Sequence, residues 1–253
     1  MASFPPNTPK DPVYWDYWHE MVKASIRRDT HELPAILEEA NIVGKHVIDA
    51  GYDPGRLVVP FSKLAASITC VRESDWSVTA IQKLVREHGL RDKVQVVKSP
   101  SVGLPLDDEV SDATYCVWVI HYAKSRWEKI VKELVRITKK GCPIVIGFTS
   151  GERDLPHLEG FTKPDNVLKT KAFDQTFPAF CEEQGWKVSV RKLVLPFQFK
   201  SPEWALEVFS NTFMRREEAV AKQKEIMEFL RQHTKDGKTV IEQEMRIYTI
   251  RVP

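Results

Sequence analysis

The chain has 253 residues, of which 42% are hydrophobic and 28% are charged, and its formal net charge is +2. This length and composition are those of a globular protein with a substantial core, and the small net charge gives no electrostatic reason to expect nucleic acid or an acidic membrane as the main partner. No stretch is apolar over a membrane-spanning length and the first residues lack an apolar signal segment, so a cytoplasmic location is expected.

Cysteine spacing gives no sign of a metal site or a disulfide. The cysteines are far apart in the chain, whereas zinc sites and redox motifs use closely spaced pairs. Three of them fall in apolar runs, where a free cysteine packs as a small hydrophobic residue. No metal is therefore expected. The four residues are Cys70, Cys116, Cys142 and Cys181.

The N-terminal part of the chain predicts two helices after a Pro-rich tip. Residues 13–26 form the first, preceded by the capping pair Asp11 and Pro12, and residues 32–40 form the second. Two interpretations of the first helix are open. Its aromatic rings dock it on the domain, or they form a lid over a ligand pocket, since such pockets are lined by aromatic side chains. These rings belong to Tyr14, Trp15, Tyr17 and Trp18.

From residue 46 onward, apolar runs alternate with helical patterns. Helices are predicted over residues 56–66, 76–88 and 126–138, and the last of them ends in two lysines and a glycine. Such alternation indicates a parallel sheet with right-handed crossovers. The predicted strands cover residues 46–49, 67–71, 94–98, 112–120 and 143–148.

The last third of the chain departs from this alternation. Its pattern predicts a helix and a strand, then two more helices, then a short turn and a final strand. In that order, these elements cover residues 173–184, 186–195, 202–212, 215–233, 235–238 and 240–252.

The stretch from Val47 to Leu57 is the most informative in the chain. It predicts a buried strand that ends in an acid, Asp49, followed by a glycine turn with Gly51 and Gly55 and by the start of a helix. A strand that enters a helix through such a turn directs backbone N–H groups and the positive end of the helix dipole at whatever lies above it. Many α/β proteins hold nucleotides in this way, so a nucleotide-like ligand is expected here.

The pattern Asp49-x-Gly51-x-Asp53-x-Gly55 resembles the Asp-x-Gly-x-Gly-x-Gly turn of class I S-adenosylmethionine (SAM) methyltransferases. Other segments resemble the same family in order and spacing, and the likeness is to its small-molecule branch (methyltransferase type 11-like). It covers about residues 36–149. The further matching segments are residues 104–113 before the fourth strand, 117–122 at its end, and 132–141 before the fifth strand.

For the fold, the resemblance implies a three-layer α/β sandwich of Rossmann-like type. Its seven-stranded, mostly parallel sheet has the order 3-2-1-4-5-7-6, with the last strand antiparallel. A single domain is expected over residues 1–253, with an N-terminal helical lid (1–41), a cofactor-binding core (42–150) and a helical insertion before the last strand (196–238).

The resemblance also implies SAM as the cofactor, but three positions depart from the family pattern. Asp53 replaces the middle glycine, Arg72 stands where an acid after strand two binds the ribose, and Pro100 stands where an acid meets the adenine. Arginine has no hydrogen-bond acceptor, so Glu73 is expected to take the ribose if strand two ends one residue late. Arg72 itself is expected in a surface ion pair. The residues expected at the cofactor are Asp49, Gly51, Asp53, Gly55, Glu73, Ser101 and Cys116.

A histidine follows the fourth strand, at the edge where open α/β sheets bind their ligands. This residue, His121, is the candidate general base, needed only for an acceptor that must lose a proton. Its alternative role is a structural contact with a neighbouring loop. The acceptor is expected to be a small molecule that the aromatic helix and the helical insertion cover. Its expected contacts, which could instead be core residues, are Tyr14, Tyr17, Trp18, Trp204 and Phe213.

Two functions are open at this point. The first is SAM-dependent methyl transfer to a small-molecule acceptor. The second, motivated by the three departures, is a methyltransferase-fold protein that has lost methylation and serves as a binding or scaffold subunit, or catalyses another reaction in the same pocket. A nicotinamide-dependent oxidoreductase is a more distant third: Arg72 suits a 2′-phosphate, but the turn lacks the G-x-G-x-x-G pattern. The oligomeric state is left open.

Overall fold

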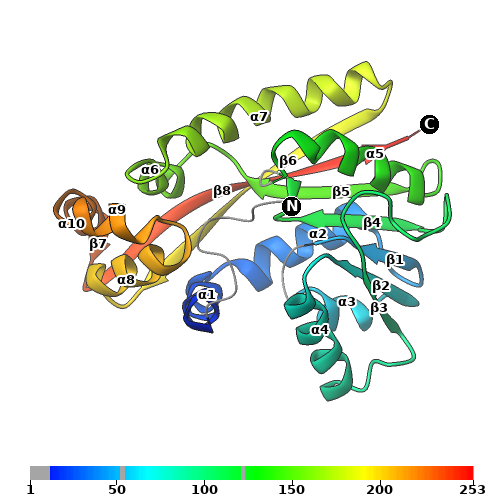
Figure 1. Cartoon of the computed structure of the whole chain (residues 1–253), viewed down its shortest axis with the longest axis horizontal. Coiled ribbons are helices and arrows are strands. Elements are labelled where there is room, and N and C mark those ends of the chain that lie inside the picture. The colour runs from blue at the N-terminus through cyan, green and yellow to red at the C-terminus, as the bar shows by residue number, and fades with distance from the viewer. Residues whose placement is uncertain (1–11, 52–54, 121–122, 253) are drawn as a thin grey trace. The chain divides into compact units, whose positions relative to one another are not determined.

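The computed structural model describes residues 12–51, 55–120 and 123–252 (Figure 1). Contacts along the chain divide it into two compact units. The helical unit consists of Met1–Glu32, Thr149–Thr176 and Lys192–Met245. The core unit consists of Leu33–Phe148, Phe177–Arg191 and Arg246–Pro253.

The core unit carries the alternating part of the chain. Its elements are α2 (Leu33–Ala40), β1 (His46–Asp49), α3 (Val58–Ser62), β2 (Ser67–Arg72), α4 (Asp75–Glu87), β3 (Val94–Lys98), β4 (Ala113–Val117), the 3-10 helix η3 (Lys124–Arg126), α5 (Trp127–Ile137) and β5 (Pro143–Thr149). The helical unit carries α1 (Pro12–Ala24), the π-helix η1 (Arg28–Glu32), α6 (Asp154–Gly160), α8 (Pro202–Thr212), α9 (Arg216–Ala221), α10 (Gln223–Gln232) and β7 (Thr234–Lys235). Three long elements have residues in both units: α7 (Pro164–Glu183), β6 (Lys187–Phe199) and β8 (Lys238–Arg251).

The sheet has the order β3-β2-β1-β4-β5-β8-β6, with the two-residue β7 paired to β8 beside this path. β8 corresponds to the predicted last strand, residues 240–252, which is number seven in the predicted order. The predicted order 3-2-1-4-5-7-6 is therefore confirmed. β1 is parallel to both of its neighbours, with Asp49 opposite Cys70 on one side and Tyr115 on the other. The pairs β2–β3 and β4–β5 are parallel as well. The carboxyl ends of these strands therefore lie at one edge of the sheet (Figure 1).

Strand β4 is shorter than the run that predicts it. All of its residues are buried, as expected for a parallel strand covered on both faces. It ends at Val117 because the next residue, Trp118, has a φ of 65°, a left-handed backbone that no strand continues through. The Trp118 N–H still donates to the Gly147 carbonyl, at 2.7 Å. The end of the apolar run therefore lies in a turn rather than in the strand.

Strand β2 is one residue longer than predicted. Arg72 belongs to it and is paired with Lys98 of β3. Glu73 is then the first residue after the strand. The apolar run ends at Val71, and the pairing of Arg72 with Lys98 extends the strand beyond it.

Several helices differ from the sequence prediction in their bounds, two of them at proline or glycine residues. The helix predicted over 215–233 is interrupted at Lys222 and gives α9 and α10. α7 begins at Pro164, a residue favoured in the first turn of a helix, rather than at 173. α6 has no counterpart in the sequence prediction, since it contains Pro156 and Gly160, residues that usually indicate loops.

The short turn before the final strand has the predicted position. Asp236 and Gly237 both have positive φ, 50° and 73°. This is the conformation that two-residue hairpin loops favour and that the Asp-Gly pair adopts readily. The turn joins β7 to β8, with Lys235 opposite Lys238.

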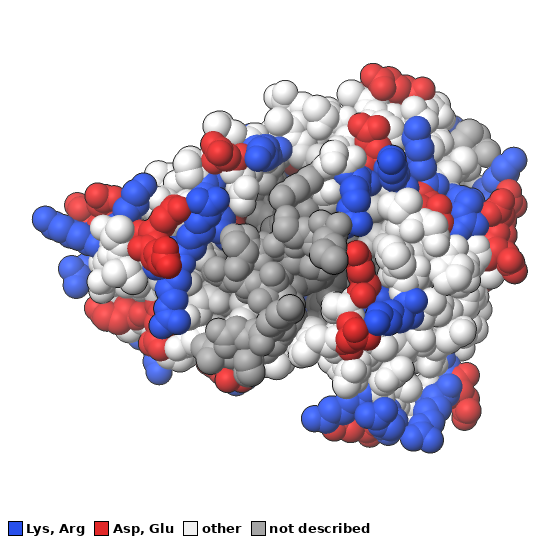
Figure 2. All heavy atoms as spheres, viewed as in Figure 1, with Lys and Arg blue, Asp and Glu red and all other residues white. Residues whose placement is uncertain are grey.

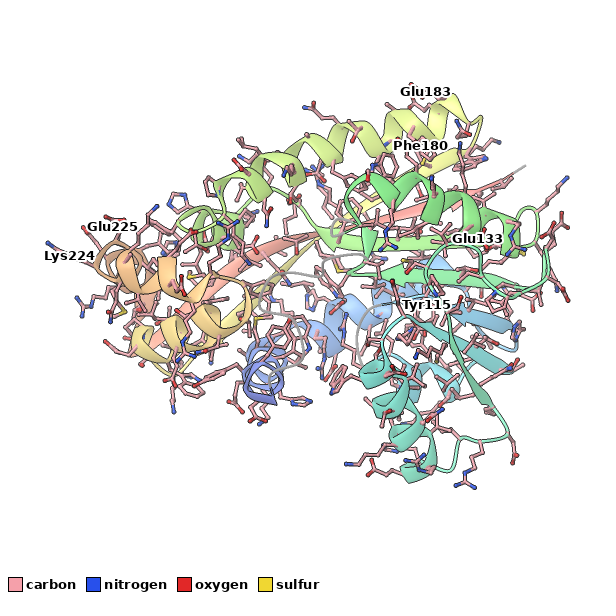
Figure 3. All side chains as sticks on the ribbon, viewed as in Figure 1. Tyr115, Glu133, Phe180, Glu183, Lys224 and Glu225 are labelled. Carbon is pink, nitrogen blue, oxygen red and sulfur yellow. The ribbon has the colours of Figure 1, made fainter. Side chains whose placement is uncertain are left out.

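An aromatic cluster joins α7 to the sheet in the core unit. Phe177 is fully buried, with its ring centroid 4.9 Å from that of Tyr248 and 6.1 Å from that of Phe148. Trp127 of α5 lies edge-on to Phe180, with centroids 4.9 Å apart, and Figure 3 shows Phe180 on the side of α7 that faces α5. These rings fix the C-terminal half of α7 on the core unit by burial and by their edge-to-face geometry.

The surface carries no strong charge of one sign over the described part of the face in Figure 2, where basic and acidic side chains are interspersed. Within the described ranges, no helix is both long enough and apolar enough to cross a membrane.

Replacing Phe177 by alanine should remove the centre of the aromatic cluster and leave a cavity that the surrounding sheet cannot fill. The expected loss is about 3–5 kcal/mol of unfolding free energy, measured by urea denaturation. Leu168→Ala on the same helix is the control, because that side chain is 66% exposed and its loss should change stability by less than about 0.5 kcal/mol. Equal effects of the two substitutions would contradict this packing.

Candidate functional site

The glycine turn after β1 is closed by the side chain of Asp49. The Gly51 N–H donates to Asp49 Oδ1 at 2.8 Å. A Cβ atom on Gly51 would lie 2.9 Å from that same oxygen, closer than real Cβ contacts allow. Gly55 has a φ of 100°, and a Cβ there would lie 3.0 Å from Ile81 Cγ1. The turn therefore needs glycine at both positions. Asp53, the departure from the family pattern that falls in this turn, lies outside the described residues.

Arg72 forms a buried ion pair with Asp49. Its Nη2 lies 2.7 Å from Asp49 Oδ2, and its Nη1 donates to the main-chain carbonyls of Asp49 and Val71, both at 2.8 Å. Both ionic residues are only 2% exposed. The predicted surface ion pair is therefore wrong. The reason is that the last residue of β2 directs its side chain toward the end of β1, where an acid is already buried.

A sequence signal for this pair exists. An arginine at the end of an apolar strand is rarely buried without a partner, and the neighbouring strand of a parallel sheet ends in Asp49. The sequence predicts a ligand role for Asp49 and a surface role for Arg72. Their joint burial follows only from the register of β1 on β2.

Cys116 lies buried beside this pair, in β4. Its thiol donates to the Ala50 carbonyl at 3.3 Å. Burial raises the pKa of the Cys116 thiol well above its ordinary value, and the Asp49 carboxylate raises it further, against the opposing charge of Arg72. A neutral thiol of this kind is no nucleophile at physiological pH. Cys116 can line the site only as a small, uncharged side chain.

Glu73 follows β2 at the carboxyl edge of the sheet. Its Oε2 lies 3.9 Å from Arg126 Nη2, at the limit of an ion pair, and both side chains are about one-third exposed. A pair that is this long and this accessible contributes little. The Glu73 carboxylate can therefore exchange this partner for a ligand hydroxyl at small cost.

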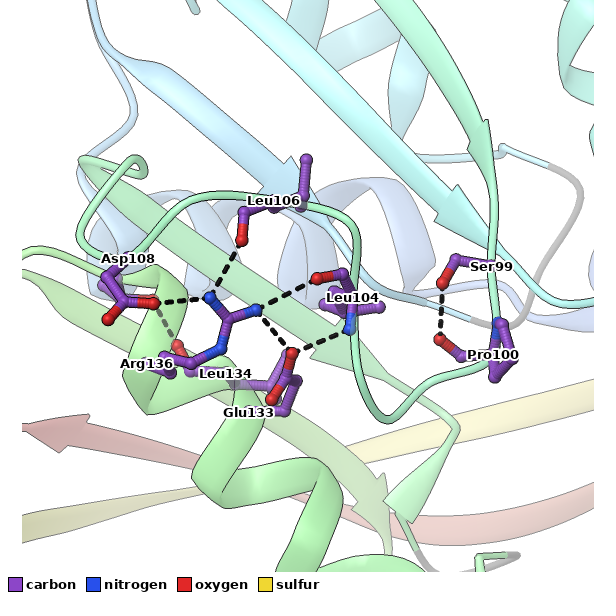
Figure 4. Close-up of polar contacts among 9 residues, drawn as sticks. Ser99, Pro100, Leu104, Leu106, Asp108, Glu133, Leu134 and Arg136 are labelled. Atoms are coloured by element: carbon purple, nitrogen blue, oxygen red, sulfur yellow. Dashed lines mark hydrogen bonds and ion pairs between the residues drawn. The ribbon is translucent and has the colours of Figure 1, made fainter.

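The loop after β3 is held close to β2. The Ser99 N–H donates to the Arg72 carbonyl at 3.0 Å, and the Ser99 hydroxyl donates to the Pro100 carbonyl, also at 3.0 Å (Figure 4). Pro100 offers no N–H and no side-chain acceptor. Ser101, the next residue, is half-buried in this loop, and its expected contact with a cofactor stays a prediction.

Arg136 of α5 holds the segment that leads into β4 (Figure 4). Its guanidinium donates to the Leu106 carbonyl at 2.8 Å and to the Leu104 carbonyl at 3.1 Å. It also pairs with Asp108 and Glu133, both at 2.6 Å. The hydrogen bond from Arg136 lowers the pKa of Glu133 below its ordinary range. Glu133 also accepts the Leu104 N–H at 2.7 Å, so two side chains of α5 fix this segment to the helix.

The five residues expected to contact the acceptor lie in the helical unit, and the structure brings them together. Ring centroids of Tyr14 and Trp18 are 6.1 Å apart, those of Trp18 and Phe213 6.3 Å, and those of Tyr17 and Trp204 6.2 Å. The Tyr17 hydroxyl donates to Glu207 at 2.5 Å, and this hydrogen bond raises the pKa of the phenol. The helix α1 is therefore docked on α8, as the first interpretation has it. Its role as a lid stays a prediction.

A buried lysine supports this aromatic cluster and was missed by the sequence analysis. Lys163 is 6% exposed, and its Nζ donates to the carbonyl of Phe213, the C-cap residue of α8. Burial lowers the pKa of Lys163. Burial raises the pKa of Glu159 to about 7, against the opposing charge of Lys163. The spacing of four residues between Glu159 and Lys163 places opposite charges close together on a helix, which is the sequence signal for this pair. Such pairs are usually exposed, so the spacing does not predict burial.

His121, the candidate base, lies outside the described residues, so its role stays a prediction. Across residues 12–51, 55–120 and 123–252, no group of three His, Cys, Asp or Glu side chains could hold a metal ion.

Comparisons with known proteins agree with this geometry. Residues 48–146 match a family model described as "Methyltransferase domain". Norajmaline N-methyltransferase from Rauvolfia serpentina is 28% identical over 166 residues, which are 63% of this chain and 55% of that protein. The chain therefore matches only about half the length of this curated relative.

Solved structures share the fold. The YcgJ protein of Bacillus subtilis superposes with a TM-score of 0.66 at 18% identity, covering 88% of this chain and 99% of the other. A SAM-dependent methyltransferase from Thiobacillus denitrificans, solved with S-adenosyl-L-homocysteine (SAH), has a TM-score of 0.63 at 16% identity, covering 97% and 99%. At such identities the likeness establishes the fold alone.

Glu159 should make the stability of the protein depend on pH. Its pKa is about 7 in the folded state against an ordinary value of 4.5, so the folded state holds the proton more tightly. Stability is then fully present below pH 4.5 and is lost as the pH rises through about 7, by up to roughly 3 kcal/mol. Urea denaturation of wild type and Glu159→Gln from pH 4.5 to 8 measures this, and the variant should lack this component of the slope.

Glu152→Gln is the matched control for that series, because Glu152 is an exposed carboxylate shortly before α6. It should leave the pH dependence as in the wild type. Identical slopes in wild type and Glu159→Gln would show that Glu159 titrates as it does in the unfolded chain.

Proposed function

We propose that this chain is a class I methyltransferase that transfers the methyl group of SAM to a small-molecule acceptor, a proposal supported by the fold and by the match of residues 48–146. The observation that carries the proposal is the glycine turn after β1. Asp49 accepts the Gly51 N–H there, and an added Cβ would collide with the carboxylate. The end of β1 thus combines an acid with a close approach of the backbone, which is what this family uses to hold its cofactor.

The residues around the turn fit SAM. Gly51 and Gly55 allow the tight turn that directs backbone N–H groups toward a ligand, and Glu73 is proposed to offer its carboxylate to the ribose hydroxyls after β2. A charge-assisted hydrogen bond of this type contributes about 1.5–3 kcal/mol. Ser101 and the uncharged Cys116 are the further contacts proposed along the same edge. Pro100 offers nothing to the adenine amino group, so affinity depends more strongly on Glu73 than in a protein with both acids.

When bound, SAM supplies an electrophilic methyl group on a positively charged sulfur. The chain contributes position: transfer is an in-line displacement, and holding donor and acceptor in line lowers the barrier by removing the entropy of encounter. His121 is the proposed base for an acceptor that must lose a proton. An amine that reaches the site unprotonated needs none.

The acceptor proposed for this chain is a small molecule with an apolar ring system. The aromatic cluster of Tyr14, Tyr17, Trp18, Trp204 and Phe213 supports this, because ring faces bind flat apolar surfaces. Norajmaline N-methyltransferase, the relative named above, is by its name an enzyme that methylates a nitrogen of norajmaline. No observation favours nucleic acid as the acceptor.

The alternatives receive no support. A binding or scaffold role was motivated by Arg72, Pro100 and Asp53, but Glu73, the first residue after β2, is proposed to make the ribose contact that Arg72 cannot make. A nicotinamide cofactor with a 2′-phosphate required the Arg72 guanidinium, whose two terminal nitrogens are committed to Asp49 and Val71.

Purified protein should bind SAH. At a ligand concentration of a hundred times Kd, linkage adds about 2.7 kcal/mol of stability, which for a chain of this size raises the melting temperature by about 5–10 °C. Incubation with methyl-labelled SAM and a cell extract should then place label in the low-molecular-weight fraction. No thermal shift at millimolar SAH would contradict the proposal, and label in the protein or RNA fraction would contradict the acceptor class.

Glu73→Ala should weaken SAH binding by about 1.5–3 kcal/mol, roughly 10- to 150-fold in Kd, because the ribose loses its carboxylate. Titration calorimetry gives the Kd. Asp75→Ala is the matched control: this nearby acid is exposed and pairs with Lys98 on the surface, so its loss should leave the Kd within about twofold. Tight binding by wild type and Glu73→Ala alike would mean that another group takes the ribose.

A further inference from the structure

The ends of β1 and β2 are joined by one guanidinium group. Arg72 donates to the carboxylate of Asp49, to the main-chain carbonyl of Asp49 and to the carbonyl of Val71. The first two bonds reach Asp49 at the end of β1. The third bond is made to Val71 of β2, just before Arg72 and Glu73 in the chain. One side chain therefore ties together the two backbone segments from which the proposed cofactor contacts arise.

The orientation of Asp49 depends on this contact. One carboxylate oxygen of Asp49 accepts from Arg72 and the other accepts from the Gly51 N–H. The carboxylate therefore cannot rotate without losing one of these two hydrogen bonds. A Cβ on Gly51 would be 2.9 Å from Asp49 Oδ1 and 3.8 Å from Arg72 Nη2, which places the guanidinium directly behind the turn. The Gly51 conformation is thus held through Asp49 by Arg72.

We infer that Arg72 is a positioning residue of the cofactor site: through Asp49 it fixes the Gly51 turn, and through Val71 it fixes the backbone that presents Glu73. This inference rests on the proposed function for its ligand. It also gives the arginine at the ribose position a role. Arg72, which replaces the family's acid, holds the glycine turn, and Glu73, the next residue, is the acid proposed to bind the ribose.

Lysine cannot replace Arg72 in this role. The guanidinium uses two nitrogen atoms, in a fixed plane, to reach acceptors on both strands, whereas a lysine offers one nitrogen. Removing the cation altogether leaves the buried Asp49 carboxylate without its counter-charge, which costs more than the pair itself contributes. Arg72→Lys therefore tests the bridge while keeping the charge, and Arg72→Met tests the loss of both.

The experiment is a double-substitution cycle read out as the Kd for SAH by titration calorimetry. Arg72→Met, Asp49→Asn and Arg72→Lys should each raise the Kd by about tenfold or more. The double variant Arg72→Met with Asp49→Asn should be no weaker than the weaker single variant, because Arg72 acts through Asp49. Effects that multiply in the double variant, or an unchanged Kd in folded Arg72→Lys, would overturn the inference.

A ligand-free measurement gives a second readout. The amide hydrogen of Gly51 should exchange with solvent at least about tenfold faster in Arg72→Lys than in wild type, measured by NMR, because its acceptor is no longer fixed. Exchange that stays as slow as in wild type would also overturn the inference.

Arg191→Met is the matched control for the arginine substitutions, since Arg191 pairs with Glu38 on the surface of the same unit. It should change neither the Kd nor the exchange of Gly51. The proposed function fails separately, when wild-type protein does not bind SAH. The inference fails when wild type binds it and the Arg72 variants bind it equally well.

Discussion

The buried ion pair between Asp49 and Arg72 is the interaction on which the rest of this site depends. Two opposite charges, each 2% exposed, lie at the carboxyl edge of the sheet. Burying them is costly, and the cost is offset only because every hydrogen bond around them is made: to the Gly51 N–H and to two carbonyls. Since neither charge is stable there alone, the pair specifies one arrangement of the two strand ends and of the glycine turn between them.

At two other places a cationic side chain also donates hydrogen bonds to main-chain carbonyls. Arg136 donates to the carbonyls of Leu104 and Leu106 in the segment before β4. Lys163 donates to the carbonyl of Phe213 at the end of α8, in the helical unit. In each case a cationic side chain donates to main-chain carbonyls at the end of a strand or helix, or in the segment that leads into one. Buried carbonyls need donors, and a long side chain from a regular element can supply them without imposing secondary structure on the loop.

This view changes the meaning of the departures from the family pattern. Taken one at a time, an arginine, a proline and an aspartate each remove a cofactor contact. In the structure, Arg72 pairs with Asp49 behind the glycine turn, and β2 extends to Arg72, so Glu73 is the first residue after the strand. Under the proposed function, Glu73 takes the ribose in place of the acid that Arg72 replaces, and Pro100 gives no side-chain contact to the adenine. The proposed site is then a rearranged version of the family arrangement, in which cofactor affinity depends on fewer residues.

How much of this was determined by the sequence depends on the range of the interactions. The strand order, the glycine turn, α8 with its bounds, the Asp236-Gly237 hairpin and the grouping of aromatic residues follow from patterns a few residues long or from the family resemblance. The sequence offers a signal for the ion pair but does not fix it, because Asp49 and Arg72 are distant in sequence and meet only through the register of β1 on β2. The end of β4 at Trp118 and the burial of Lys163 under Phe213 were also decided by tertiary contacts. Local patterns determine which elements form; only packing decides which charges are buried together.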